Sequence, residues 1–206
     1  MPRLFRSPLL VLAPAVLLAA GPIPVTPARL VQASDSVGRA IRYRVDVAAA
    51  PDSVWQAWTS PDHVREWFAP AARIELRPLG RFEILFAPDA PPGQRGAENN
   101  LVLAVQPPRL LSFTWDAPPH LPEAREQRTS VTIRLQPLGS GQTRVWFEQT
   151  GWGDGGQWDQ AFQYFMEAWK SVLALLQYRF ARGPVDWSRA FDETRLAPYR
   201  AAVTPW

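Results

Sequence analysis

Residues 157–182, QWDQAFQYFMEAWKSVLALLQYRFAR, form the longest segment of the chain with a single clear periodicity. Large apolar side chains recur there every three or four residues, the spacing of one helix face: Trp158, Phe162, Phe165, Trp169, Val172 and Leu176. Gly183-Pro184 ends the pattern, because proline cannot continue a helix. At about 1.5 Å per residue the segment predicts a helix about 37 Å long, which needs a broad apolar surface to cover.

The segments before this helix predict that surface. Apolar and charged residues alternate over 39–47, which is the pattern of a half-buried strand. Six further segments have the composition of strands, at 73–77, 81–86, 100–105, 110–115, 130–135 and 143–150. Pro51 and Pro61 each open a short helix after the first strand. This order predicts an α+β helix-grip fold: a curved antiparallel sheet of about seven strands wrapped around the long C-terminal helix.

A family resemblance lies in these same segments. Residues 48–70, AAAPDSVWQAWTSPDHVREWFAP, resemble the opening signature of the SRPBCC (START / Bet v 1-like) superfamily. Within it, the chain is most similar to the family of the heat-shock-protein-90 ATPase activator C-terminal domain. The supporting segments are LGRFEILF (79–86), PPRLLSFTW (107–115), LGSGQT (138–143), and Trp169 followed by Val172, Leu173 and Leu176. The resemblance spans 39–182 and implies the helix-grip fold, but relatives include ligand carriers, cyclases and co-chaperone domains, so it leaves the activity open.

Residues 1–33 have the pattern of a signal peptide. Arg3 and Arg6 precede an apolar run, Pro8 to Ala20, that is shorter than the about 20 residues of a membrane span. Val31-Gln32-Ala33 fits a cleavage site before Ser34, although sites near Ala20 and Ala28 are rivals. An uncleaved N-terminal anchor is the alternative.

The expected organisation follows from this leader. We predict a cleaved signal peptide at 1–33, a helix-grip domain at 34–182 and a C-terminal extension at 183–206. The mature protein is expected to be periplasmic or secreted, with no stable membrane span after cleavage. Trp187, Phe191 and Leu196 predict that the extension packs on the domain and adds a short helix.

Charge and composition exclude several classes of function. Residues 1–33 hold three of the 22 basic residues and none of the 19 acidic ones, so the remaining chain is formally neutral. Without a basic stripe, no nucleic-acid partner is expected. The absence of cysteine excludes thiol chemistry, and two histidines, His63 and His120, argue against a histidine metal site. We expect no metal and no cofactor.

The motif GWGDGG at 151–156 satisfies the glycine spacing of a dinucleotide fingerprint. Such a site needs a second parallel strand and an acidic residue about 20 positions later. Leu176 stands at that distance, inside the predicted helix, and no strand follows. We therefore predict a strand-to-helix joint and no nucleotide binding.

Isolated polar residues give weak catalytic signals. His63 and Glu66 share one helix face, but nothing nearby completes a metal site, and a solvated face explains them. Asp116 and Glu148 are the best acid–base candidates if the protein is an enzyme, and the alternative is pairing with arginines on neighbouring strands. No set of residues is assigned as catalytic.

The aromatic residues suggest an apolar ligand pocket between the sheet and the long helix. The expected lining residues are Phe82, Phe86, Phe113, Trp115, Phe162, Phe165, Met166 and Trp169. Core packing is the alternative for each of them. The leading hypothesis is an exported binder of a hydrophobic small molecule or lipid. The alternatives are a co-chaperone-like module whose protein partner is unknown, and a cyclase- or hydrolase-like enzyme using Asp116 or Glu148.

Overall fold

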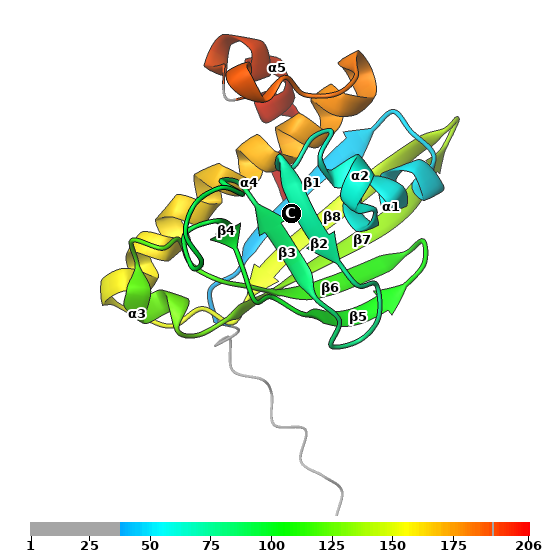
Figure 1. Ribbon diagram of the computed structural model, residues 1–206. Coiled ribbons are helices and arrows are strands. Elements are labelled where there is room, and N and C mark those ends of the chain that lie inside the picture. Colours follow the sequence, from blue (N-terminus) through cyan, green and yellow to red (C-terminus); the bar gives the residue numbers. More distant parts are fainter. Residues whose placement is uncertain (1–37, 191) are drawn as a thin grey trace, which may run out of the picture. The chain divides into compact units, whose positions relative to one another are not determined.

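The larger sheet of the protein is antiparallel and has six strands. The structure is a computed structural model that describes residues 38–190 and 192–206 (Figure 1). The strand order is β5-β6-β7-β8-β1-β9. The bounds are β1 Ile41–Val47, β5 Val102–Gln106, β6 Leu110–Trp115, β7 Thr129–Gly139, β8 Gln142–Thr150 and β9 Thr204–Pro205. The predicted leader, its cleavage site and Phe191 lie outside the described residues.

A second, smaller sheet departs from the expected single sheet. It consists of β2 (Ala71–Ile74), β3 (Phe82–Leu85) and β4 (Gly96–Ala97). The strands predicted at 73–77 and 81–86 correspond to β2 and β3, which pair separately from the others, and β2 ends at Ile74, three residues earlier than predicted. A tight turn joins β2 to β3: a Cβ at Gly80 would lie 2.1 Å from the Glu75 carbonyl oxygen, so this turn requires glycine. Hydrogen bonds of 2.8 Å from Leu79 N to Val102 O and from Val102 N to Gly80 O tie the turn to β5.

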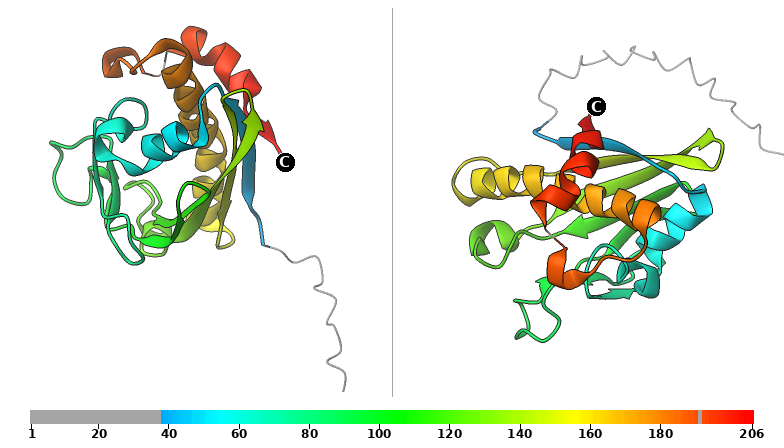
Figure 2. Two further views of the ribbon diagram at one scale, coloured as in Figure 1. Left: turned by 90° about the vertical axis from the view of Figure 1, so that its right-hand side faces the viewer. Right: turned by 90° about the horizontal axis from the view of Figure 1, so that it is seen from above.

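The predicted helices are present. α1 (Pro51–Thr59) and α2 (Pro61–Val64) follow β1, and α4 (Gly156–Arg182) is the long helix of the periodic segment. α3 (Pro122–Arg125), the 3-10 turn η1 (Trp187–Arg189) and α5 (Glu193–Ala202) complete the described elements. Figure 2 shows α4 lying along one face of the larger sheet, with the small sheet, α1 and α2 on the same side. This arrangement confirms the helix-grip fold.

Alternation along the strands builds the core under α4. The buried apolar residues of β6, β7 and β8 lie on one face of the sheet, as the pattern of every second residue predicts: Leu111, Phe113, Trp115, Val131, Ile133, Leu135, Val145 and Phe147. From the helix, Trp169 enters this layer, with its ring centroid 4.4 Å from that of Phe147 and 5.2 Å from that of Trp115. Three polar residues, Thr129, Thr143 and Gln149, share this buried face, and the other polar residues of these strands are less buried.

The glycine motif lies at the joint between β8 and α4. A Cβ at Gly153 would lie 2.5 Å from Nε1 of Trp158, so the missing side chain permits the first turn of the helix to fold back on the loop. Gly155 is the N-cap of α4 and has a φ of 72°, in the region that favours glycine. The motif thus serves the joint that the sequence predicted.

The C-terminal extension packs against the domain. α5 lies on α4, where Arg200 forms an ion pair of 2.9 Å with Glu167. β9 pairs with β1 at the sheet edge, and the Trp206 indole N–H donates to the main-chain oxygen of Tyr43 at 2.9 Å. The short strand was not predicted from the sequence. It covers an edge that would otherwise expose unpaired backbone groups.

Leu196 should carry much of this docking, because it is the buried residue of α5 and is only 2% exposed. Leu196→Ala is expected to cost about 2–4 kcal/mol of unfolding free energy. Thermal unfolding followed by circular dichroism measures the loss. Thr194→Ala, at an exposed position of the same helix, is the matched control and should cost less than about 0.5 kcal/mol. Equal melting temperatures for the two variants would show that the extension does not pack.

Candidate functional site

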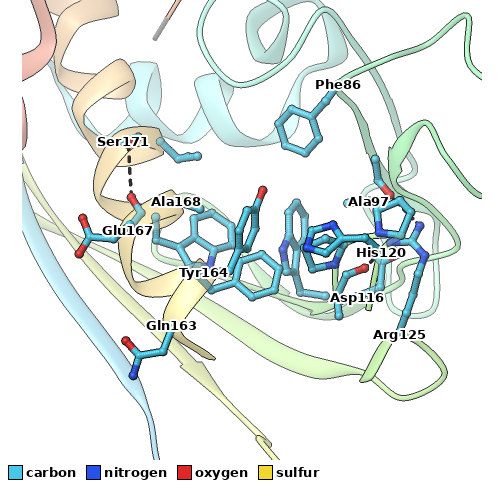
Figure 3. Close-up of a pocket in the computed structure, with 18 of the residues that line it drawn as sticks. Phe86, Ala97, Asp116, His120, Arg125, Gln163, Tyr164, Glu167, Ala168 and Ser171 are labelled. Atoms are coloured by element: carbon cyan, nitrogen blue, oxygen red, sulfur yellow. Dashed lines mark hydrogen bonds and ion pairs between the residues drawn. The ribbon is translucent and has the colours of Figure 1, made fainter. Parts of the chain in front are cut away.

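A pocket of about 680 Å³ opens between α4, the small sheet and the end of β6 (Figure 3). Phe86, Gly96 and Ala97 contribute from the small sheet and its loops, and Phe68 from the segment after α2. The end of β6 and the loop after it contribute Trp115, Asp116, Ala117, Pro118, Pro119 and His120, and α3 contributes Arg125. α4 contributes Gln163, Tyr164, Phe165, Glu167, Ala168, Trp169, Ser171 and Val172.

Four of the eight predicted lining residues lie on this pocket: Phe86, Trp115, Phe165 and Trp169. They come from the end of β3, from β6 and from one face of α4. Trp115 is the last residue of β6, beyond the point where β3 covers the strand. Its ring, at 5.9 Å from that of Phe68, forms one wall.

The other four predicted residues belong elsewhere in the fold. Phe82 and Phe113 are fully buried and stack on one another with ring centroids 4.1 Å apart, so each fills the space next to the other. Phe162 packs against Trp152, with ring centroids 5.1 Å apart. Met166 packs against the core on the β1 side of α4, where its main-chain oxygen accepts a hydrogen bond from the Tyr43 hydroxyl. These residues close the core and do not line the pocket.

The mouth of the pocket carries one aromatic residue that was predicted from the sequence, Phe86, and one that was not, Tyr164. Their side chains are 42% and 49% exposed, respectively. His120 is also exposed, and its ring stands edge-on to that of Tyr164, with the ring centroids 6.2 Å apart. Tyr164 and Ala168 are one helical turn apart on α4 and both line the pocket. Their spacing places them on one face of the helix, and this spacing is the sequence signal that could have identified these two residues.

Asp116 is the buried carboxylate of the pocket, with only 1% of its side chain exposed. Its Oδ1 accepts a hydrogen bond of 2.9 Å from Nδ2 of Asn100. Its Oδ2 lies 2.8 Å from Nη1 of Arg125 but accepts no well-aligned hydrogen bond from the described residues. Burial raises the pKa of the Asp116 carboxyl, and Asn100, Arg125 and Arg128 oppose that rise.

The guanidinium of Arg125 donates its hydrogen bonds to main-chain carbonyl oxygens. Nη1 donates to Ala117 O, and Nη2 donates to Gly96 O at 2.8 Å and, more weakly, to Gly93 O at 3.3 Å. The guanidinium therefore fastens the β3–β4 loop to α3 and holds the wall of the pocket in place. This explains why the guanidinium lies beside Oδ2 of Asp116 without donating an aligned hydrogen bond to it.

The second acid–base candidate, Glu148, lies on the other face of the larger sheet. It stands opposite Arg42 in the β1–β8 register and accepts a hydrogen bond of 2.7 Å from that residue's Nε. The structure therefore does not bring Asp116 and Glu148 together. Glu148 has the cross-strand ion pair that was the alternative explanation for it.

His63 and Glu66 do not begin a larger polar cluster. Nδ1 of His63 lies 3.5 Å from Glu66, and that carboxylate also accepts a hydrogen bond of 2.7 Å from Nε of Arg179. Glu66 therefore anchors the end of α4 to the α1–α2 region. Within residues 38–190 and 192–206, no three His, Asp or Glu side chains gather as metal ligands would. The helices in this part of the chain lack an apolar stretch that could cross a membrane.

The raised pKa of Asp116 predicts a characteristic pH dependence. The folded state holds this proton more tightly than the unfolded state, so the contribution of Asp116 to the unfolding free energy falls as the pH rises from about 4. Subtracting the unfolding free energy of Asp116→Asn from that of the wild type isolates this contribution. Urea unfolding over a pH series measures the difference, which should decrease with increasing pH.

Asp46 supplies a control of opposite sign. The hydrogen bond from Arg144 lowers the pKa of the Asp46 carboxyl, so its stabilisation is present above the ordinary aspartate range and is lost as the pH falls. The same difference for Asp46→Asn should therefore increase with pH. If both free-energy differences changed in the same direction with pH, that result would contradict the raised pKa of Asp116.

Comparisons with known proteins agree with this architecture. The crystal structure of CalU16 from Micromonospora echinospora is 24% identical, with 79% of this chain and 83% of that chain covered and a TM-score of 0.55. The Aha1 dimer from Colwellia psychrerythraea is 17% identical, with 70% and 98% covered and a TM-score of 0.54. PFC0360w, an HSP90 activator from Plasmodium falciparum, is 12% identical, with 72% and 99% covered and a TM-score of 0.53. At these identities the likeness shows the fold alone.

A family model gives the stronger assignment. No curated protein matches the chain. The model described as "Activator of Hsp90 ATPase homolog 1-like protein" matches residues 48–181, from the start of the α1 region to the end of α4. These residues are more than half of the chain and include the whole pocket wall. The chain therefore belongs to the family of activator of Hsp90 ATPase homolog 1-like proteins within the SRPBCC superfamily.

Proposed function

We propose that this protein binds a hydrophobic small molecule or lipid in the pocket between α4 and the sheets. The observation that supports the proposal most directly is the open volume of about 680 Å³ beside the aromatic core. Pockets for small ligands commonly have volumes of about 300–1,000 Å³ and mostly apolar walls. The rings of Phe68, Trp115 and Phe165 give this pocket such a wall.

A co-chaperone-like role is the second candidate, because the family is described by Hsp90 ATPase activation and the similar Plasmodium protein is an HSP90 activator. A protein-interaction module of this kind has no need of an internal cavity. The enzymatic alternative has less support, because Asp116 and Glu148 lie on opposite sides of the larger sheet. The cavity therefore favours ligand binding.

Export is part of the proposal. The charged start of the chain, its short apolar run and the small residues before Ser34 support a cleaved leader and a periplasmic or secreted protein. In that compartment a carrier of apolar molecules has an evident use, since such molecules cross water poorly on their own. An ATP-dependent chaperone would be an unexpected partner there.

Filling the pocket tests the binding proposal. Ala168 lines the pocket from α4, so the new ring of Ala168→Phe has open space to enter. We expect this variant to weaken the binding of Nile red, an apolar fluorescent probe, at least tenfold. Its unfolding free energy should change by less than about 1 kcal/mol, whereas a ring forced into a packed core costs about 1–3 kcal/mol.

Ala181→Phe is the matched control, because Ala181 is an exposed residue of the same helix and lies outside the pocket. It should leave the affinity for Nile red unchanged. If the wild type does not bind the probe and Ala168→Phe is strongly destabilised, the pocket is not a ligand site. That result would favour the interaction module.

The export proposal is tested separately by the intact mass of protein recovered from its own host. The mature chain should lack residues 1–33, or a shorter leader ending near Ala20 or Ala28. Cleavage depends on small residues near the cut, so Ala33→Arg should leave the precursor uncut or move the cleavage position. Full-length protein confined to the membrane fraction would contradict the proposal.

A further inference from the structure

The polar groups of the pocket are not spread evenly over its wall. Figure 3 shows Asp116, His120 and Arg125 gathered at one end and Glu167 and Ser171 at the other. The polar groups at the Ser171 end already have hydrogen-bond partners. The Ser171 hydroxyl donates to Glu167 O, and Arg200 of α5 donates to the side chains of both Ser171 and Glu167. At the other end Asp116 is buried, so an incompletely satisfied hydrogen-bonding atom of this residue has a large energetic consequence.

One such atom is Oδ2 of Asp116. It is buried and lies 2.8 Å from Nη1 of Arg125, but it accepts no aligned hydrogen bond from the described residues, whereas Oδ1 accepts one from Asn100. Thr114 Oγ1 in turn donates to Oδ1 of Asn100 at 3.2 Å, so the carboxylate is fixed in orientation by a second layer of contacts. The contact with Arg125 offsets part of the cost of burying this acceptor, and a ligand that supplies an aligned donor would offset more of it.

The charges around this atom restrict the kind of donor. Arg125 and Arg128 both place positive charge near Asp116, so an ammonium group would meet two cations beside the single carboxylate. An anionic head group would instead face the carboxylate, while the N–H groups of Arg125 already bind the carbonyls of Ala117 and Gly96. A neutral hydroxyl group satisfies Oδ2 without either conflict.

Resting on the proposed apolar pocket, we propose that Asp116 selects among ligands by accepting a hydrogen bond from a neutral hydroxyl group at Oδ2. The ligand class is therefore an apolar, ring-bearing alcohol or phenol, with its ring system between Trp115 and Phe165. A molecule of the same shape without the hydroxyl leaves Oδ2 with the Arg125 contact alone and without an aligned hydrogen bond. Discrimination against missing hydrogen-bond donors is stronger than discrimination by size alone.

A pair of probes that differ only in the donor tests this assignment. β-Naphthol and its methyl ether have nearly the same apolar body, but only the naphthol can donate a hydrogen bond. Competition with Nile red gives the affinity of each. We expect the wild type to bind the naphthol about tenfold more tightly than the ether. Asp116→Asn, which places an amide where the carboxylate stood, should reduce this ratio to about one.

Glu148→Gln is the matched control, because it neutralises a carboxylate on the opposite face of the larger sheet. It should keep the wild-type ratio. If Asp116→Asn does not fold, the ratio measured on the wild type decides alone. Equal binding of naphthol and ether by the wild type, or an unchanged ratio in a folded Asp116→Asn, would overturn the role of Asp116 and leave the apolar pocket standing. Failure of the wild type to bind Nile red would overturn both proposals.

Discussion

The buried and hydrogen-bonded position of Trp169 determines how α4 lies on the larger sheet, and the pocket depends on that position of the helix. The indole is 1% exposed and packs against Phe147 and Trp115, while its N–H donates to Oε1 of Gln149 at 2.6 Å. Gln149 Nε2 donates to Thr129 Oγ1, which donates to Trp115 O, each at 2.9 Å. A buried chain of this kind allows one position of the helix, because any shift leaves polar atoms without partners. The helix is therefore held next to the end of β6, and the space beside it stays open.

Much of this fold could be predicted from the sequence. The apolar stripe of 157–182 identified α4, and alternation identified the strands of the core, because both patterns are local. Local patterns do not report which strands share a sheet, so the separation of β2 and β3 was missed. β9 and α3 were missed for a similar reason: at two and four residues they have no period, and their formation depends on distant partners.

The pocket was predictable in kind and only partly in its residues. Phe113 and Trp115 both point inward from β6, and alternation cannot distinguish them. Phe82 stacks on Phe113 and keeps it out of the pocket, whereas Trp115 lies beyond β3 and lines the pocket. Asp116 was considered as a possible acid or base, but its fixed orientation depends on Asn100 and Arg125, which are distant in sequence or lie in an unpredicted helix. The family resemblance was enough to predict the fold, whereas the contacts of a single polar side chain such as Asp116 depend on the three-dimensional packing.

The central claim is that the space beside Trp169 is a binding site for an apolar molecule and not an incidental gap in the packing. Native mass spectrometry of the protein purified from its own host tests this claim most directly, because a ligand held between the aromatic walls of the pocket survives gentle desolvation. We expect a population carrying a discrete small-molecule mass, which is lost in Ala168→Phe and retained in Ala181→Phe. Protein that carries no added mass and also fails to take up apolar probes would contradict the claim.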